Sequence, residues 1–227
     1  MSRKRKPPTP PEGSFEFTVP ELCRSELDAA IDVLVQRGNL IATHVLASAA
    51  HDVMRGYATR EGLELRADMP TIFGRLAPAK RDRLVDAIFH PYNSMKHSNS
   101  SDVAVAVHPD LVDATLFCAT QEYGSLFGHL SPKMVCYIAW FTVVKPSLRA
   151  SSGEGLSSIL QMFPSALAES ERPDQLLELK ELLREIDENP ERYIDYQAAF
   201  ATAEMWGAPV TASPFQEREG NADERFE

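Results

Sequence analysis

Apolar residues recur along most of this chain at the three- and four-residue spacing of a helix face, and strand-like alternation is rare. The first such pattern lies in residues 20–36, where apolar positions fall at i, i+3, i+4 and i+7. Pro20 is tolerated in the first turn of a helix, and Gly38 stands where a helix commonly ends. The pattern therefore predicts a helix over residues 20–36 that stops at Gly38.

Asn39 begins the second pattern, which runs to residue 57. Asn is a favoured N-cap residue, and the apolar side chains that follow it gather on one side of a helical wheel. Four polar residues gather on the opposite side, namely His44, Ser48, His51 and Arg55. Because this narrow stripe faces away from the apolar side, we interpret it as a solvent-exposed face. A binding role for it requires another helix or a second subunit to cover it.

Further segments show the same periodicity. Residues 78–90 predict a helix that Pro91 kinks or ends. Residues 109–128 are apolar on most of their circumference, which predicts the central helix of a core, and residues 133–144 form the next helix after Ser131-Pro132. A Ser-rich linker containing one short helix follows. Beyond it, one leucine stripe starts at Pro173 and a second apolar stripe follows Pro190.

These elements predict an all-α protein, an up-and-down helical bundle with a C-terminal helical hairpin. A chain of 227 residues, 44% of them apolar, is long enough for one such core. The predicted order is a disordered basic and proline-rich arm (1–18), the bundle (19–146), a linker (147–172), the hairpin (173–208) and an acidic disordered tail (209–227). The hairpin supplies more apolar surface than an annex needs, which also predicts a homodimer.

Charge and cysteine use narrow the classes of partner and compartment. A formal net charge of −10 repels polyanions, so any contact with RNA or a nucleotide has to be local. The basic run at residues 3–6 precedes prolines rather than the apolar core of a signal peptide, and the longest apolar run is far too short to span a bilayer. The three cysteines form no CxxC pair. We therefore expect reduced, buried thiols in a cytoplasmic protein that does not enter a membrane.

The motifs of the common nucleophile-elbow, phosphate-loop, dinucleotide-binding and zinc enzymes are missing from the sequence, and no cofactor is predicted. His44 and His51 are separated by seven residues, about 10 Å along a helix, so this pair cannot chelate one metal ion without a further element. Glu122 and His129 have the same spacing on the predicted central helix. We interpret them as an ordinary polar edge.

The hexapeptide from Tyr92 to His97 carries the most suggestive chemistry. If the segment after Pro91 is helical, Asn93 and His97 are one turn apart, and an amide and an imidazole share one face. Such a pair orients a water or a phosphate, with His97 as proton donor or acceptor and Lys96 stabilising developing negative charge. The alternative interpretation is a polar helix terminus, because His and Lys near a C-terminus complement the helix dipole.

Residues 26–32, 42–56 and 93–97 together resemble a group of bacterial helical proteins that are similar to HEPN domains, the nucleotide-binding helical bundles of prokaryotes and higher eukaryotes. The resemblance covers residues 22–145. HEPN ribonucleases have an Arg followed, after four to six residues, by a His, often with an Asn directly after the Arg. The resemblance places that Asn at Asn93 and that His at His97.

This chain departs from the HEPN pattern at two positions. Tyr92 stands where the Arg is expected, and a phenol lacks the permanent charge that a guanidinium offers a phosphate. In the related bacterial group two acidic residues commonly follow the Ala-Ala of the second helix, whereas this chain has His51 and Asp52 there. Arg83 and His90 also fit the Arg-to-His spacing, but without the companion Asn.

The resemblance implies two functions of different classes. The first is a catalytically degenerate HEPN-like bundle that binds or assembles, for which His44, His51, Arg55 and Tyr92 are the candidate binding residues. The acidic charge and the missing Arg favour this function. The second is a metal-independent endoribonuclease.

In the endoribonuclease, His97 and Asn93 act together with a positive group such as Lys96, Arg55 or a residue of a second subunit. A third alternative is a metal-dependent hydrolase built on His44, His51, Asp52 and His97. It requires two helices to bring these ligands together.

Overall fold

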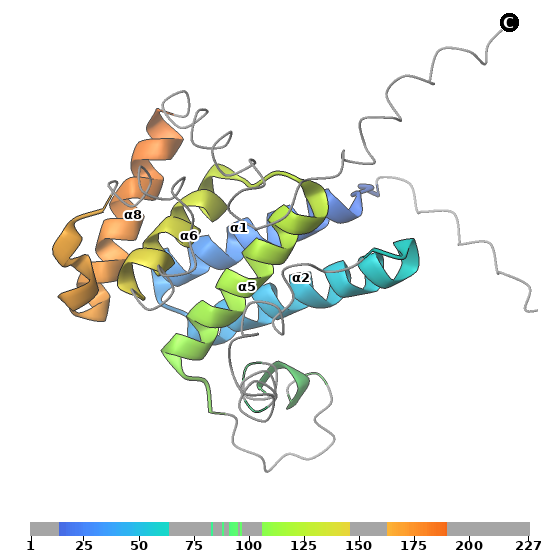
Figure 1. The fold of residues 1–227 in the computed structure, drawn as a ribbon, viewed down its shortest axis with the longest axis horizontal. Coiled ribbons are helices and arrows are strands. Elements are labelled where there is room, and N and C mark those ends of the chain that lie inside the picture. The colour runs from blue at the N-terminus through green and yellow to red at the C-terminus, as the bar shows by residue number, and fades with distance from the viewer. Residues whose placement is uncertain are drawn as a thin grey trace, which may run out of the picture.

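The computed structural model describes residues 14–63, 83, 88, 91–94, 96, 106–145 and 163–189. Every regular element in these ranges is a helix, which confirms the prediction of an all-α protein for this part of the chain. Figure 1 shows the elements in order: α1 (Val19–Arg37), α2 (Leu40–Glu61), α5 (Pro109–Phe127), α6 (Pro132–Val144), the short 3-10 helix η3 (Ser165–Glu169) and α8 (Arg172–Glu188).

The first two helices form a hairpin whose turn is encoded locally. Thr18 caps α1 in a capping box, because its hydroxyl accepts from the Glu21 amide while the Glu21 carboxylate accepts from the Thr18 amide at 2.8 Å. Gly38 ends α1 in the left-handed conformation with a φ of 59°, and Asn39 starts α2 by accepting from the Ala42 amide at 3.1 Å. The predicted boundaries at Gly38 and Asn39 are confirmed.

Contacts between the helices fix their relative directions. The Thr43 hydroxyl lies 3.5 Å from the Ala30 carbonyl oxygen, and the Cys23 thiol lies 3.8 Å from the Ala50 carbonyl oxygen. Since one residue number falls as the other rises, α1 and α2 are antiparallel.

The helix α5 runs in the same direction as α2. His51 contacts Glu122, and the rings of Tyr57 and Phe127 have centroids 5.6 Å apart, so the residue numbers of the two helices rise together. The helix α5 also packs on α1 and α6, as its broad apolar surface predicts. It therefore packs on three of the described α-helices, whereas α1 packs on four, so the expected central position is shared with α1.

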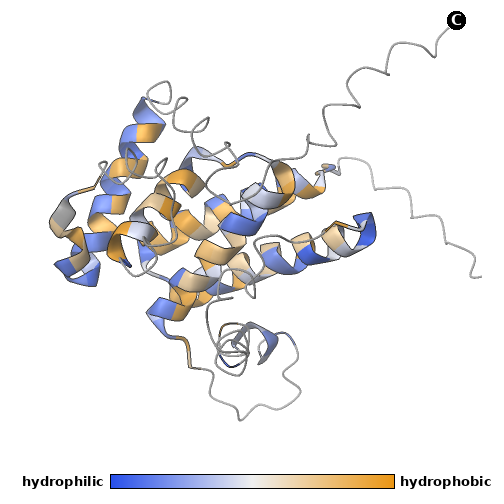
Figure 2. Ribbon diagram, in the orientation of Figure 1, coloured by the Kyte–Doolittle hydropathy of each residue, from blue (hydrophilic) through white to orange (hydrophobic). Residues whose placement is uncertain are grey.

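The helix α6 is buried from Met134 to Val144, and Figure 2 shows that it is largely apolar. Its two large polar aromatic residues have partners for their polar atoms. The Tyr137 hydroxyl donates to the Asp113 carbonyl at 2.9 Å, and the Trp140 indole N–H donates to the Gln175 carbonyl at 2.7 Å. Through these bonds α6 joins α5 to α8.

The helix α8 packs on α6 and α1 through the leucine stripe that the sequence assigns to the hairpin. Leu179, Leu183 and Ile186 are buried, whereas Leu177 is 53% exposed. The leucine stripe of α8 is therefore largely covered within the chain. The homodimer stays a prediction, and the second helix of the hairpin lies outside the described residues.

Some expectations fall outside the described ranges. They concern the basic end of the arm, the acidic tail, most of the helix over residues 78–90, and His97. Pro91 is itself helical, together with the three residues after it, whereas residues 89 and 90 lie outside the described ranges, so the expectation that Pro91 kinks or ends the helix stays a prediction. As predicted, the cysteines are free and buried, namely Cys23, Cys118 and Cys136. Among the described helices, none combines the length and the apolar character needed to cross a membrane.

Candidate functional site

The polar stripe of α2 is buried, so its interpretation as a solvent-exposed face is wrong. The side chains of His44 and Ser48 have no exposed surface, and His51 is 3% exposed; only Arg55 reaches solvent. The reason is that α2 packs on α5 as well as on α1, and a helical wheel of α2 alone cannot reveal the second neighbour. We call the buried residues the α2–α5 polar seam: His44, Ser48, His51 and Glu122.

At the centre of the seam the His51 imidazole contacts the Glu122 carboxylate through Nδ1 and Oε2. The Glu122 side chain is fully buried. A buried carboxylate needs a polar partner, and this contact supplies one while it fixes which imidazole nitrogen faces the carboxylate. The interpretation of Glu122 as a polar edge is therefore wrong. The sequence carried one signal of this pairing. Glu122 lies in a helix that is apolar on most of its circumference, and a charged residue buried in such a helix usually has a polar partner.

His129 does not join this pair. Its Nε2 lies 3.0 Å from the Tyr123 hydroxyl, and its Nδ1 lies 2.9 Å from the Phe127 carbonyl oxygen. His129 thus closes the end of α5, and its sequence spacing from Glu122 has no functional meaning.

His44 and Ser48 form the other half of the seam. Among the described residues, neither ring nitrogen of His44 has a hydrogen-bond partner, and the Ser48 hydroxyl has none. Burial lowers the pKa of His44, because the imidazolium would lose its hydration. The folded protein therefore holds His44 as a neutral imidazole near pH 7.

Tyr92 and Lys96 of the hexapeptide meet the outer side of α2 next to the seam. The Lys96 ammonium donates to the Asp52 carboxylate at 2.9 Å and lies 5.4 Å from the centre of the Tyr92 ring. This hydrogen bond raises the pKa of Lys96. Asn93 is exposed and Tyr92 is half-buried. The structure thus brings Tyr92 and Lys96 together at Asp52, the residue that follows the buried His51.

Arg55 lies one turn beyond Asp52 on α2 and is exposed. Within the described residues the Arg55 guanidinium has no ion-pair partner. We call the group around the Lys96–Asp52 pair the motif surface: the exposed residues Asp52, Arg55, Asn93 and Lys96 and the half-buried Tyr92. The seam residues His44 and His51 do not belong to it, although the sequence grouped them with Arg55.

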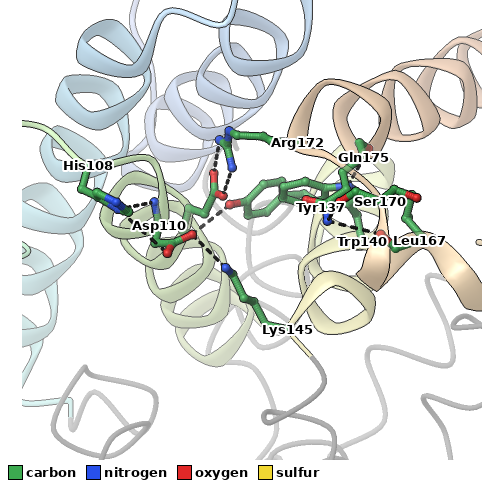
Figure 3. A network of polar contacts seen from close by, with 10 residues as sticks. His108, Asp110, Tyr137, Trp140, Lys145, Leu167, Ser170, Arg172 and Gln175 are labelled. Atoms are coloured by element: carbon green, nitrogen blue, oxygen red, sulfur yellow. Dashed lines mark hydrogen bonds and ion pairs between the residues drawn. The ribbon is translucent and has the colours of Figure 1, made fainter.

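A second polar network holds α8 against the helices α5 and α6 (Figure 3). The Asp113 carboxylate accepts two hydrogen bonds from the Arg172 guanidinium, at 2.5 and 2.9 Å, and the Lys145 ammonium donates to Asp110 at 2.8 Å. Burial raises the pKa of Asp113 more than Arg172 lowers it. Both basic side chains pair with a carboxylate, Arg172 with Asp113 and Lys145 with Asp110. We therefore interpret the network as a link between α8 and the helices α5 and α6 rather than as a ligand site. The sequence analysis missed it because Asp113 and Arg172 are far apart in the chain.

No three His, Cys, Asp or Glu side chains within the described ranges are grouped as metal ligands would be. Of the ligands that a metal-dependent hydrolase would use, Asp52 pairs with Lys96 and His51 contacts Glu122. No protein-family model, no curated protein and no solved structure matches the chain.

Proposed function

We propose that the protein is a catalytically degenerate HEPN-like helical bundle that binds RNA or a nucleotide through the motif surface. The observation that carries this proposal is the ion pair between Lys96 and Asp52 at 2.9 Å. A cation that already has a carboxylate partner offers less attraction to a phosphate than an unpaired one. Tyr92 stands where HEPN ribonucleases have Arg, so the motif lacks its second charge as well.

The burial of His44 and His51 removes two of the candidate binding residues from the surface and limits the proposed site to the exposed groups. The His51 imidazole contacts Glu122 beneath the surface, where a scissile phosphate would not reach it. The exposed groups that remain are Asn93, which offers a donor and an acceptor, and Arg55, which offers a planar cation. This set suits recognition of a phosphate or a base better than proton transfer. The net charge of −10 limits such binding to this local surface.

A combined cleavage and binding experiment tests the proposal. Wild type, His97→Ala and Asp52→Asn are incubated with mixed RNA substrates, with and without a chelator, and the affinity for labelled RNA is measured by fluorescence anisotropy. We expect no cleavage by any variant and tighter RNA binding by Asp52→Asn, because Lys96 then lacks its carboxylate. Asp32→Asn is the matched control, since it makes the same charge change and releases Lys133 from an ion pair of 2.7 Å between α1 and α6.

Three outcomes would contradict the proposal. Cleavage by wild type that is lost in His97→Ala would establish the alternative, a metal-independent endoribonuclease acting through His97 and Asn93. Cleavage that is lost only with chelator would favour a metal-dependent hydrolase. Equal RNA affinity of Asp52→Asn and Asp32→Asn would remove the motif surface as the binding site. Light scattering coupled to size exclusion tests the predicted homodimer separately, and a strict monomer would contradict it.

A further inference from the structure

The α2–α5 polar seam contains a titratable group that the proposed function does not use. His44 and Ser48 are one helical turn apart and fully buried, and within the described residues neither has a hydrogen-bond partner. Buried polar side chains in folded proteins are nearly always hydrogen-bonded. His44 and Ser48 are two such exceptions one turn apart, so the packing of α2 is less favourable at this level than elsewhere.

We propose that His44 makes the contact between α2 and α5 a proton-sensitive joint, which is closed while the imidazole is neutral and opens locally in mild acid. The proposal rests on the burial of His44 and on the lack of a partner for either ring nitrogen among the described residues. A proton on this imidazole would create a buried charge without a counter-charge, which is costly. Separation of α2 from α5 would hydrate that charge.

Among the described residues of α5 that face His44, none offers a carboxylate to an added proton. His51 and Glu122 are in contact with each other two turns further along the seam. Because α2 and α5 run in the same direction, His44 lies at the level of residue 115 of α5, a threonine. Between these levels lies Cys118, a thiol whose pKa burial raises strongly, so that it stays neutral.

On the other side, α1 reaches the level of His44 near Ala30, whose carbonyl oxygen lies 3.5 Å from the hydroxyl of the adjacent Thr43. Three carboxylates of α1 lie near this level. Asp32 is held by Lys133 at 2.7 Å, and Asp28 accepts a hydrogen bond from Ser131. Glu26 lies one turn before Ala30, and its buried Oε2 has no hydrogen-bond partner among the described residues. None of these carboxylates raises the pKa of His44, which burial lowers, so a charged His44 would gain little compensation from α1 or α5.

The direction of the pH effect follows from proton linkage. Below the ordinary histidine pKa of 6.5, the open state binds a proton at His44 that the closed seam excludes. The closed seam is therefore most stable above pH 6.5 and loses stability as the pH falls toward the lowered pKa of the folded state. Within that window, each fall of one pH unit raises the equilibrium constant for opening by up to about tenfold.

Amide hydrogen exchange at pH 7.5 and pH 5.5, corrected for the intrinsic rate, tests the proposal on the full chain. We expect the amides of α2 and α5 near the seam to lose up to about tenfold more protection at pH 5.5 than those of α6. His44→Leu should abolish this extra loss, because an apolar side chain suits the buried position and takes up no proton. Ser48→Ala is the control within the seam, because it removes a buried hydroxyl but no titratable group, and it should keep the extra loss of protection seen in wild type.

An equal loss of protection in wild type and His44→Leu would overturn the proposal, because the effect would then belong to another group such as His51 or Glu122. If His44→Leu does not fold, an NMR titration of the wild-type imidazoles decides. We expect the His44 resonance to keep its neutral position in the closed state at pH 6.5. A His44 that is half-protonated at pH 6.5, with the protection of α2 and α5 unchanged at pH 5.5, would also overturn the proposal.

Discussion

Replacing Glu122 with Leu tests whether the His51–Glu122 contact stabilises the bundle. Leu is similar in size to Glu, but it removes the carboxylate that contacts the His51 imidazole. The His51 side chain is only 4% exposed, so water cannot readily replace the lost contact. Breaking a buried charged pair costs about 3–5 kcal/mol. Depriving a neutral buried group of a hydrogen bond costs about 1–3 kcal/mol. From these two ranges we expect a loss of about 3 kcal/mol in the free energy of unfolding.

Urea unfolding at pH 7.5, followed by the helical circular dichroism signal, measures this loss. In thermal unfolding the same loss should lower the melting temperature by roughly 6–12 °C, at about 2–4 °C per kcal/mol for a chain of this size. The double variant with His51→Leu should recover most of the stability, because an apolar pair can replace a buried polar one. Arg184→Ala, which removes an exposed ion pair with Glu181, should have no measurable effect. A Glu122→Leu protein as stable as Arg184→Ala would refute the reasoning.

Two further substitutions test the turn between α1 and α2 and the docking of α8. Gly38→Ala should cost about 1–2 kcal/mol, because φ is 59° there, whereas Gly56→Ala, where a Cβ would meet nothing within 4 Å, should stabilise α2 by about 0.5–1 kcal/mol. Urea unfolding measures both, and effects in the opposite order would contradict the assignment of the turn. Arg172→Met leaves Asp113 buried without its guanidinium, so limited proteolysis of α8 should accelerate more than about tenfold at neutral pH, since breaking a buried pair costs about 3–5 kcal/mol. The Asp113 pKa is raised in the fold and rises further without Arg172, so acid should restore protection by protonating the carboxylate; acceleration that is equal at pH 5 and pH 7.5 would contradict this account.

The sequence predicted the helices well where the signals are local. Gly38 and Asn39 define the turn between α1 and α2 as expected, and Ser131 caps α6 by accepting from the Met134 amide at 3.2 Å. Each signal depends on contacts within a few residues, so it can be recognised before the tertiary structure is known. The apolar periodicity also predicted these helices correctly, because it is a property of each segment alone.

The candidate site was harder to predict because its contacts join distant parts of the chain. The wheel of α2 identified the polar stripe correctly but assigned it to solvent, since nothing in α2 itself indicates that Glu122 of α5 lies against His51. Likewise, Lys96 was singled out from the motif, whereas its partner Asp52 is 44 residues away. Periodicity tells which residues share a face, but it does not tell what covers that face.

The indole of Trp140 gives the protein a built-in reporter of its own C-terminal segment. The chain has only two tryptophans, and the other, Trp206, lies outside the described residues. Trp140 is fully buried in α6, and its N–H bonds the backbone of α8 at Gln175. In a Trp206→Phe background, undocking of α8 would transfer this single fluorophore from an apolar setting to water. The emission wavelength would then follow the attachment of α8 in real time without any added label.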